Sequence, residues 1–140
     1  MTEFKSAFVD TSPFIYYIEK SSQYFEKMKF WFSESYKADK NLVTSPVTIE
    51  EYCVYPLKNH RLEYVHTFRS FIDDMGIFVS RIDFDTAFLA AQLRSKYQDF
   101  KAMDALQLAT AIQNRCDIFL TNDKQLRQVT EIKVLLVDEL

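Results

Sequence analysis

The sequence predicts an α/β fold, a three-layer α/β/α sandwich around a mostly parallel central sheet of four to five strands. Two observations support this class. Short apolar runs typical of buried strands alternate along the chain with longer segments of helical periodicity. Two of these runs end on an aspartate flanked by hydroxyl and amide side chains, at Asp10 and at Asp123. In open parallel sheets, ligands bind beyond the carboxyl ends of the strands, so both aspartates are candidate site residues.

The remaining elements follow in chain order. Pro13 and Pro46 suit the first turn of a helix, and Pro56 is expected to end the helix that Pro46 begins. The run Asp73–Gly76 closes the next helix, and Asp83 caps the one after it. The expected strands are residues 6–9, 42–44, 77–79, 118–120 and 134–137. The expected helices are residues 13–19, 23–38, 45–57, 61–71, 83–97, 102–113 and 124–129. This alternation implies right-handed crossovers and a sheet covered on both faces.

The helix expected at residues 23–38 is unusually aromatic. One stripe at near-helical spacing is expected to pack in the core; it consists of Tyr24, Phe25, Met28, Phe32 and Tyr36. Phe30 and Trp31 fall outside this stripe. We therefore expect these two side chains on the surface, at an interface with a second copy or with another protein.

Composition limits the class of protein. The length of 140 residues fits one domain, expected to span residues 1–140, and 48% hydrophobic with 26% charged residues is typical of a globular chain. The chain has neither a long uncharged apolar stretch nor a signal-peptide core, so we expect a cytoplasmic protein without a membrane span. Cys53 and Cys116 form no paired motif and are expected to be small core residues. A single glycine, Gly76, excludes glycine-rich phosphate loops.

Three aspartates are candidates for a shared cation site. Asp10 precedes Thr11 and Ser12, either of which could cap the next helix, so capping does not require the aspartate. Asp104 lies in the first turn of an alanine-rich helix, where an acid also interacts favourably with the helix dipole. Asp123 follows an apolar strand within a turn. Because an unpaired buried charge costs several kcal/mol, acids at strand ends indicate a bound cation.

Glu50 and Glu51 are candidates for a fourth acid. Neighbours on a helix point about 100° apart, so only one of them readily faces the same pocket, and periodicity does not choose between them. The polar side chains beside the two strand ends are expected to orient carboxylates or to hold water; they are Thr11, Ser12, Thr121 and Asn122. His60 and His66 have neither a zinc-binding spacing nor a triad partner, and both are expected to be structural or exposed.

Together these motifs resemble the PIN-domain family, and in particular the VapC-like toxins of bacterial toxin–antitoxin modules. The opening Phe-Val-Asp-Thr-Ser-Pro-Phe-Ile resembles the family's first motif, with its first acid at Asp10. The second motif has a glutamate six residues after a strand-end serine, and that spacing from Ser45 selects Glu51. The run Asp104–Ala111 matches the Asp-Ala-x-x-x-Ala-Thr-Ala pattern, and Thr121–Lys124 matches the closing Thr-Asn-Asp motif.

The resemblance implies a PIN-like sandwich and an endoribonuclease that depends on Mg²⁺ or Mn²⁺. Its catalytic residues would be the acids that hold one or two cations: Asp10, Glu51, Asp104 and Asp123. Members of the VapC branch commonly form homodimers and are silenced by a small antitoxin protein. RNA, an antitoxin and a second copy of the chain are therefore the implied partners.

The chemistry of these side chains agrees with that assignment. Hard oxygen ligands suit Mg²⁺ and Mn²⁺, which keep several waters for a substrate. RNA hydrolysis needs a water that attacks the phosphorus in line and a group that stabilises the departing 3′-oxygen, and a bound cation supplies both. Lys124 is expected to touch the RNA backbone. The net charge of −3 predicts that nonspecific electrostatic binding to nucleic acid is weak.

Two other classes of protein compete with this hypothesis. A signalling receiver domain also gathers acids around Mg²⁺, but it needs a phosphoacceptor aspartate at the end of a central strand, and neither Thr44 nor Val79 precedes one. A PIN-like scaffold that binds partners without cleaving RNA is the second competitor. The loss of metal-ligating acids would be its signature, and all four acids are present here.

Overall fold

A computed structural model describes residues 3–140 and contains five strands, six α-helices and two short 3₁₀ helices within that range. The strands are β1 (Ser6–Val9), β2 (Asn41–Thr44), β3 (Phe78–Val79), β4 (Ile118–Thr121) and β5 (Lys133–Leu136). The helices are α1 (Thr11–Ile18), α2 (Phe25–Lys37), α3 (Pro46–Lys58), α4 (Leu62–Met75), α5 (Phe84–Lys96), α6 (Ala102–Gln113), η1 (Lys124–Gln128) and η2 (Val137–Glu139). The expected α/β class is confirmed.

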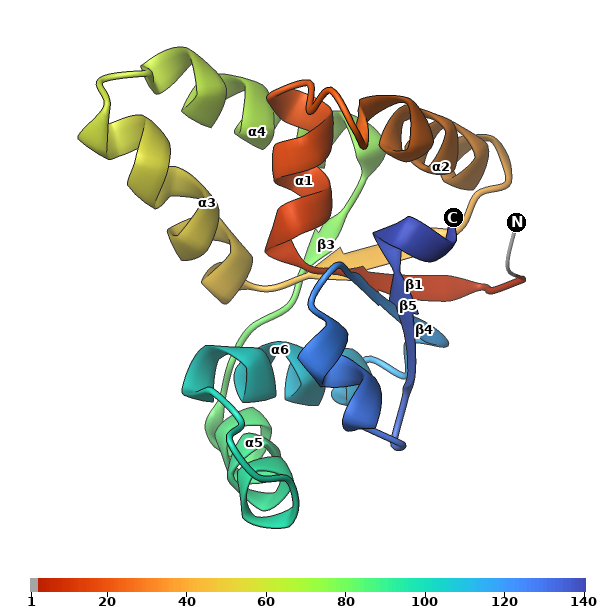
Figure 1. Cartoon of the computed structure of the whole chain (residues 1–140), viewed down its shortest axis with the longest axis vertical. Coiled ribbons are helices and arrows are strands. Elements are labelled where there is room, and N and C mark those ends of the chain that lie inside the picture. Colours follow the sequence, from red (N-terminus) through yellow and green to blue (C-terminus); the bar gives the residue numbers. More distant parts are fainter. Residues whose placement is uncertain (1–2) are drawn as a thin grey trace.

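The five strands form one sheet in the order β3-β2-β1-β4-β5, and every neighbouring pair is parallel. The first strand of the sequence is thus the central one. Figure 1 shows α1 to α4 on one face of the sheet and α5 and α6 on the other, which completes the three layers. Because all strands run in the same direction, their carboxyl ends meet at one edge.

Successive side chains of β1 point to opposite faces of the sheet. Ala7 and Val9 pack in the core beside α1, α2 and α4, whereas Phe8 packs in a second core beside α5 and α6. Phe8 stacks on Phe119 of β4, with ring centroids 5.1 Å apart. Burial on both faces explains why the strands are continuous apolar runs.

Two helices are longer than the sequence predicts. The helix expected at residues 45–57 ends at Lys58, one residue later, and Pro56 lies inside its last turn instead of ending it. A proline so near the end removes one backbone hydrogen bond and leaves little helix to disrupt. Similarly, α4 continues through Asp73 to Met75. It ends at Gly76, whose φ of 64° is the left-handed conformation that glycine adopts at helix ends.

The prediction for Trp31 is also wrong. Its side chain is 1% exposed and stacks on Phe4, with ring centroids 5.5 Å apart. Phe4 lies just before β1, far from Trp31 in the sequence. The periodicity of α2 gives no information about a contact with such a distant segment. Phe30 is exposed as expected, at 61%, but Tyr36 leaves the expected core stripe and is 62% exposed.

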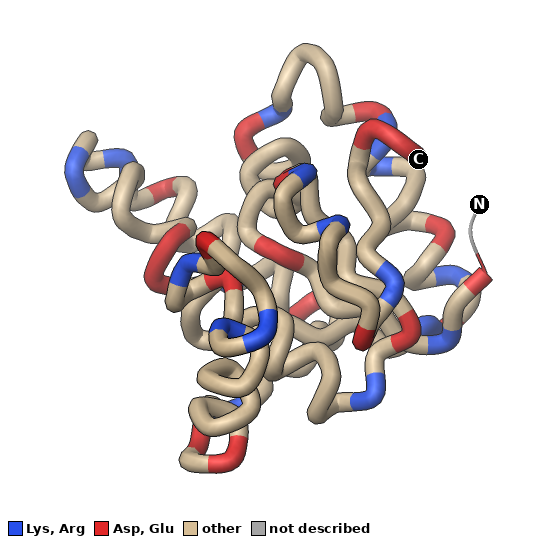
Figure 2. The backbone as a smooth tube through the Cα atoms, turned by 60° about the horizontal axis from the view of Figure 1, so that its bottom comes forward, with Lys and Arg blue, Asp and Glu red and all other residues tan. Residues whose placement is uncertain are grey.

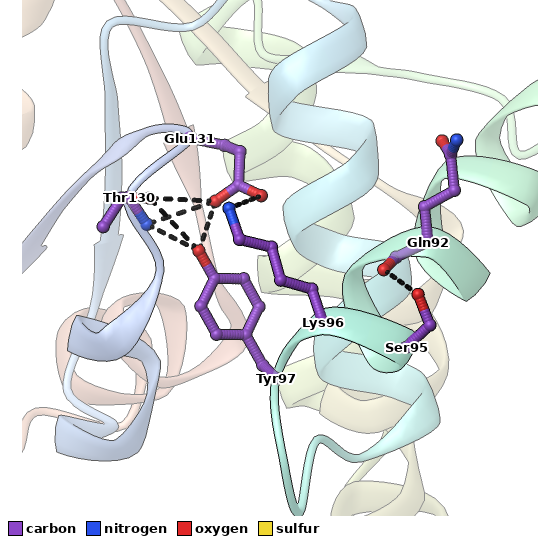
Figure 3. Close-up of polar contacts among 6 residues, drawn as sticks. All are labelled: Gln92, Ser95, Lys96, Tyr97, Thr130 and Glu131. Atoms are coloured by element: carbon purple, nitrogen blue, oxygen red, sulfur yellow. Dashed lines mark hydrogen bonds and ion pairs between the residues drawn. The ribbon is translucent and has the colours of Figure 1, made fainter.

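A polar cluster joins the end of α5 to the loop before β5 (Figure 3). The Tyr97 hydroxyl donates a hydrogen bond to Glu131 and accepts one from the backbone N–H of Thr130 at 3.1 Å. Lys96 Nζ lies 3.4 Å from a Glu131 carboxylate oxygen. These contacts connect the C-terminal end of α5 to the loop before β5, which is an edge strand of the sheet.

The histidines and Cys116 match the sequence predictions, whereas Cys53 is only half-buried and packs against the core. Both cysteines are free thiols, and Cys116 is buried. His60 and His66 are both exposed. Within residues 3–140, no helix has the length and apolar character needed to cross a membrane.

Candidate metal and nucleic-acid site

A cavity of about 420 Å³ lies at the carboxyl edge of the sheet, where β1 and β4 end. Four acidic side chains from four separate segments line it: Asp10, Glu51, Asp104 and Asp123. Asp10 and Asp123 directly precede α1 and η1, Asp104 lies in the first turn of α6, and Glu51 lies in the N-terminal half of α3; Figure 1 shows how these elements are arranged. The fold therefore brings together all four acids that the sequence singles out.

Asp10 stands at the N-cap position of α1, but its side chain makes no capping hydrogen bond. Instead, Oδ2 accepts a hydrogen bond from Thr121 Oγ1 at 2.7 Å, and Oδ1 accepts one from Gln107 Nε2 at 3.2 Å. Burial raises the pKa of Asp10, these two hydrogen bonds oppose that rise, and the charge of Asp123 adds to it. Helix capping thus does not explain this aspartate.

The structure distinguishes Glu51 from Glu50. Glu51 lines the cavity, and its Oε1 accepts a hydrogen bond from Thr11 Oγ1 at 2.6 Å. Glu50 is exposed and is not among the residues that line the cavity. Burial raises the pKa of Glu51, and the charge of Asp10 raises it further, against the effect of the Thr11 hydrogen bond.

The pKa of Asp104 responds to both burial and the neighbouring acids. Burial comes first and raises the pKa of its carboxyl, and the charges of Asp10, Asp123 and Glu51 raise it further, to about 6. Lys101 acts in the opposite direction. The rise is the electrostatic consequence of placing the four acids at one cavity.

Asp123 and Thr121 form the β4 side of the cavity. Asp123 Oδ1 accepts a hydrogen bond from the backbone N–H of Gln125 at 3.0 Å, so it also caps η1. The Thr121 hydroxyl accepts a hydrogen bond from the backbone N–H of Asp123 at 3.2 Å and donates one to Asp10. Thr121 thereby connects the two acids at the ends of β1 and β4.

The other expected supporting residues differ in position. Ser12 lines the cavity. Asn122 also lines it, but its side chain bonds away from the acids, to the Tyr16 hydroxyl at 3.3 Å and to the Asp138 backbone N–H at 3.3 Å. Lys124 is exposed and is not part of the cavity lining.

The sequence analysis missed Gln107, Ile15 and Tyr16. Gln107 is 1% exposed and bonds directly to Asp10, whereas Ile15 and Tyr16 line the cavity from α1. Gln107 stands three residues after Asp104, a spacing that places both on one face of a helix. That spacing was the available signal, but it does not show whether the Gln107 amide is buried or which groups it contacts.

The charges around the cavity favour a cation. No lysine or arginine is among the residues that line it. Elsewhere along the backbone, Figure 2 shows basic and acidic residues interspersed. In the part of the chain that the structure describes, no three acidic, cysteine or histidine side chains already stand in an ion-binding arrangement. The donor set is nevertheless the oxygen-only set that Mg²⁺ and Mn²⁺ prefer, and these ions are commonly held partly through water.

The chain is an α/β protein with an all-parallel sheet whose carboxyl edge carries clustered acids, and open α/β proteins bind ligands at that edge. A model of the PIN domain family matches residues 7–132. The chain belongs to the PIN domain family. No curated protein matches the chain.

Solved structures of similar fold come from toxin–antitoxin systems. VapBC2 from Rickettsia felis, bound to a DNA fragment from its promoter, superposes with a TM-score of 0.77 at 14% identity, over 94% of this chain and 98% of that chain. A toxin–antitoxin complex from Klebsiella pneumoniae gives 0.69 at 23% identity, over 96% and 99%. Mycobacterium tuberculosis VapC20, described as a sarcin–ricin loop cleaving toxin, gives 0.63 at 14% identity, over 81% and 86%. These likenesses establish a shared fold.

Proposed function

We propose that this PIN domain is a Mg²⁺- or Mn²⁺-dependent endoribonuclease that hydrolyses RNA phosphodiester bonds in the cytoplasm. One observation carries the proposal: four carboxylates from distant parts of the sequence line a single cavity that has no basic side chain in its lining. A structural role would leave such acids dispersed or paired with lysine and arginine, because clustered like charges repel.

The four acids would hold the cation: Asp10, Glu51, Asp104 and Asp123. A bound divalent cation lowers the pKa of water and stabilises negative charge on the departing oxygen. Thr121 and Thr11 hold the carboxylates of Asp10 and Glu51 toward the cavity through hydrogen bonds of 2.7 and 2.6 Å. Ser12, which lines the cavity, would donate a hydrogen bond to a phosphate oxygen, and Lys124, which does not line it, would contact the RNA backbone.

We further propose that the protein is the toxin of a toxin–antitoxin pair, with an antitoxin protein as its inhibitor and a homodimer as its assembly. The similar solved structures include VapBC and FitAB complexes, which supports an antitoxin partner. Phe30 and Tyr36 of α2 are exposed aromatic side chains available to a partner.

The test compares cleavage of total RNA, with Mn²⁺ and with EDTA, by the wild-type protein and by the Asp10→Asn and Asp104→Asn variants. Asp85→Asn is the matched control, because Asp85 also lies in the first turn of a helix but is exposed on α5. We expect Mn²⁺-dependent cleavage by the wild type and by Asp85→Asn, and loss of cleavage in the two site variants.

Equal cleavage by all four proteins would contradict the proposal, since the activity would then belong to a contaminant. Intact RNA in every sample, together with tight binding of a partner protein, would instead support a PIN-like binding module without nuclease activity.

A further inference from the structure

We propose that Gln107 is a positioning residue for cation binding, whose side-chain amide sets the orientation of the Asp10 carboxylate. This inference rests on the metal-dependent function proposed above. It concerns a residue that does not touch the substrate, and it follows from one buried hydrogen-bond network that joins α3, α6 and the end of β1.

Gln107 is 1% exposed, and each polar atom of its side chain has a partner. Nε2 donates to Asp10 Oδ1 at 3.2 Å and to Thr48 Oγ1 at 2.6 Å, while Oε1 accepts from the Ser45 hydroxyl. A buried amide without partners costs about 1–3 kcal/mol. The side chain is therefore held in one position by three contacts, and one of them is Asp10.

The network admits one orientation of the amide. Ser45 Oγ accepts the backbone N–H of Val47 at 3.1 Å as the N-cap of α3, so its own hydrogen is free to point at Gln107 Oε1. With the amide in this orientation, Nε2 faces Asp10. The reversed amide would place Oε1 against a carboxylate oxygen, and two acceptors repel. The Asp10 carboxylate thus selects the orientation of the Gln107 amide, and the Ser45 hydroxyl at the cap of α3 fits that orientation as a donor.

The choice of a neutral donor matters for the chemistry. Gln107 and Thr121 each donate one hydrogen bond to a different oxygen of Asp10, which fixes the plane of the carboxylate. A lysine or arginine at position 107 would neutralise Asp10 and compete with a cation. An amide orients the carboxylate and leaves its negative charge available. Residues that orient metal ligands in this way typically contribute 10–100-fold in metal affinity or activity.

The test measures Mn²⁺ binding alone, followed by the electron paramagnetic resonance signal of free Mn²⁺ at one fixed pH. Gln107→Met keeps the length of the side chain and removes its donors. We expect about tenfold weaker Mn²⁺ binding than in the wild type. The matched control is Thr110→Val, which removes a fully buried hydroxyl from the same helix, one that donates to Leu106 O and has no contact with Asp10. It should lose stability and keep wild-type Mn²⁺ affinity.

A second measurement uses the intact protein, in case Gln107→Met does not fold. In the ¹⁵N spectrum, added Mg²⁺ should shift the side-chain amide resonances of Gln107 and leave those of Gln113 unchanged. Gln113 lies on the same helix and bonds to Thr86, outside the acidic cavity.

The outcomes separate this role from the proposed function. Wild-type Mn²⁺ affinity in a folded Gln107→Met variant, or unmoved Gln107 resonances in a protein that binds Mg²⁺, would overturn the positioning role alone. A wild-type protein that binds neither ion would overturn the metal-dependent function, and the role of Gln107 with it.

Discussion

Thr11 Oγ1 donates a 2.6 Å hydrogen bond to Glu51 Oε1, so the first residue of α1 holds an acid of α3 at the cavity. Thr11 directly follows Asp10 in the sequence. Thr11 bonds to Glu51 of α3, whereas Asp10 bonds to Gln107 of α6 and Thr121 of β4. The hydrogen bond from Thr11 also distinguishes Glu51 from its neighbour Glu50, which is not among the residues that line the cavity.

This difference predicts opposite results for two adjacent substitutions. Glu51→Gln should weaken Mn²⁺ binding by about 100-fold or more, because even the loss of a residue that only orients a metal ligand typically costs about 10–100-fold. Glu50→Gln should leave it unchanged, because Glu50 is exposed outside the cavity. Titration of each variant with Mn²⁺ checks both outcomes. Equal losses in the two variants would show a general effect of charge rather than a specific ligand.

Thr121 offers a second substitution, because its hydroxyl bonds to both Asp10 and the backbone of Asp123. Thr121→Val preserves the shape of the side chain and removes both hydrogen bonds. We expect about 1–3 kcal/mol lower unfolding free energy and about tenfold weaker Mn²⁺ binding. Urea denaturation and Mn²⁺ titration measure the two effects. A loss of stability with unchanged affinity would assign Thr121 a purely structural role.

The raised pKa of Asp104 predicts how the stability of the metal-free protein depends on pH. The folded protein binds a proton at Asp104 more tightly than the unfolded chain does, with a pKa of about 6 against 3.8. The contribution of Asp104 to stability is therefore complete below pH 3.8 and is lost as the pH rises through about 6. In EDTA, Asp104→Asn should be more stable than the wild type above pH 6, and the difference should vanish near pH 4.

The expected gain is on the order of 1 kcal/mol, because partial exposure screens the repulsion. Urea denaturation at several pH values gives the comparison, and Asp85→Asn serves as the control for loss of an acid from a first helical turn. Saturating Mg²⁺ should reverse the order by stabilising only the wild type. A difference between Asp104→Asn and wild type that is constant from pH 4 to pH 7 would contradict this account.

The cluster around Tyr97 in Figure 3 predicts an effect on stability alone. Tyr97→Phe removes the hydrogen bonds to Glu131 and Thr130 and should lower the unfolding free energy by about 0.5–1.5 kcal/mol. For a chain of this length, that corresponds to a fall of about 2–5 °C in Tm. Tyr55→Phe is the control, because Tyr55 is an exposed tyrosine at 55%. RNA cleavage by both variants should equal that of the wild type, since neither tyrosine lines the cavity.

Much of the fold and of the site could be predicted because both depend on the same feature. Apolar runs identify parallel strands, parallel strands share one carboxyl edge, and acids at that edge meet. Asp10 and Asp123 were recognisable for this reason. Gln107 was not, because a polar residue within an apolar helix looks the same whether or not it has buried partners. Trp31 was mispredicted because its partner, Phe4, lies on another element, and contacts between elements leave no periodic pattern.

The central position of β1 has a consequence for the synthesis of the protein. Thr121 and Asp10, which bond to each other across the sheet, are 111 residues apart in the sequence. A nascent chain that already contains Asp10, β2 and Glu51 still lacks Asp104, β4 and Asp123 until those later segments have been synthesised. Long-range pairing of this kind also forms slowly. The four acids of a protein proposed to cut RNA therefore come together only after every segment from β1 to η1 has been synthesised and packed.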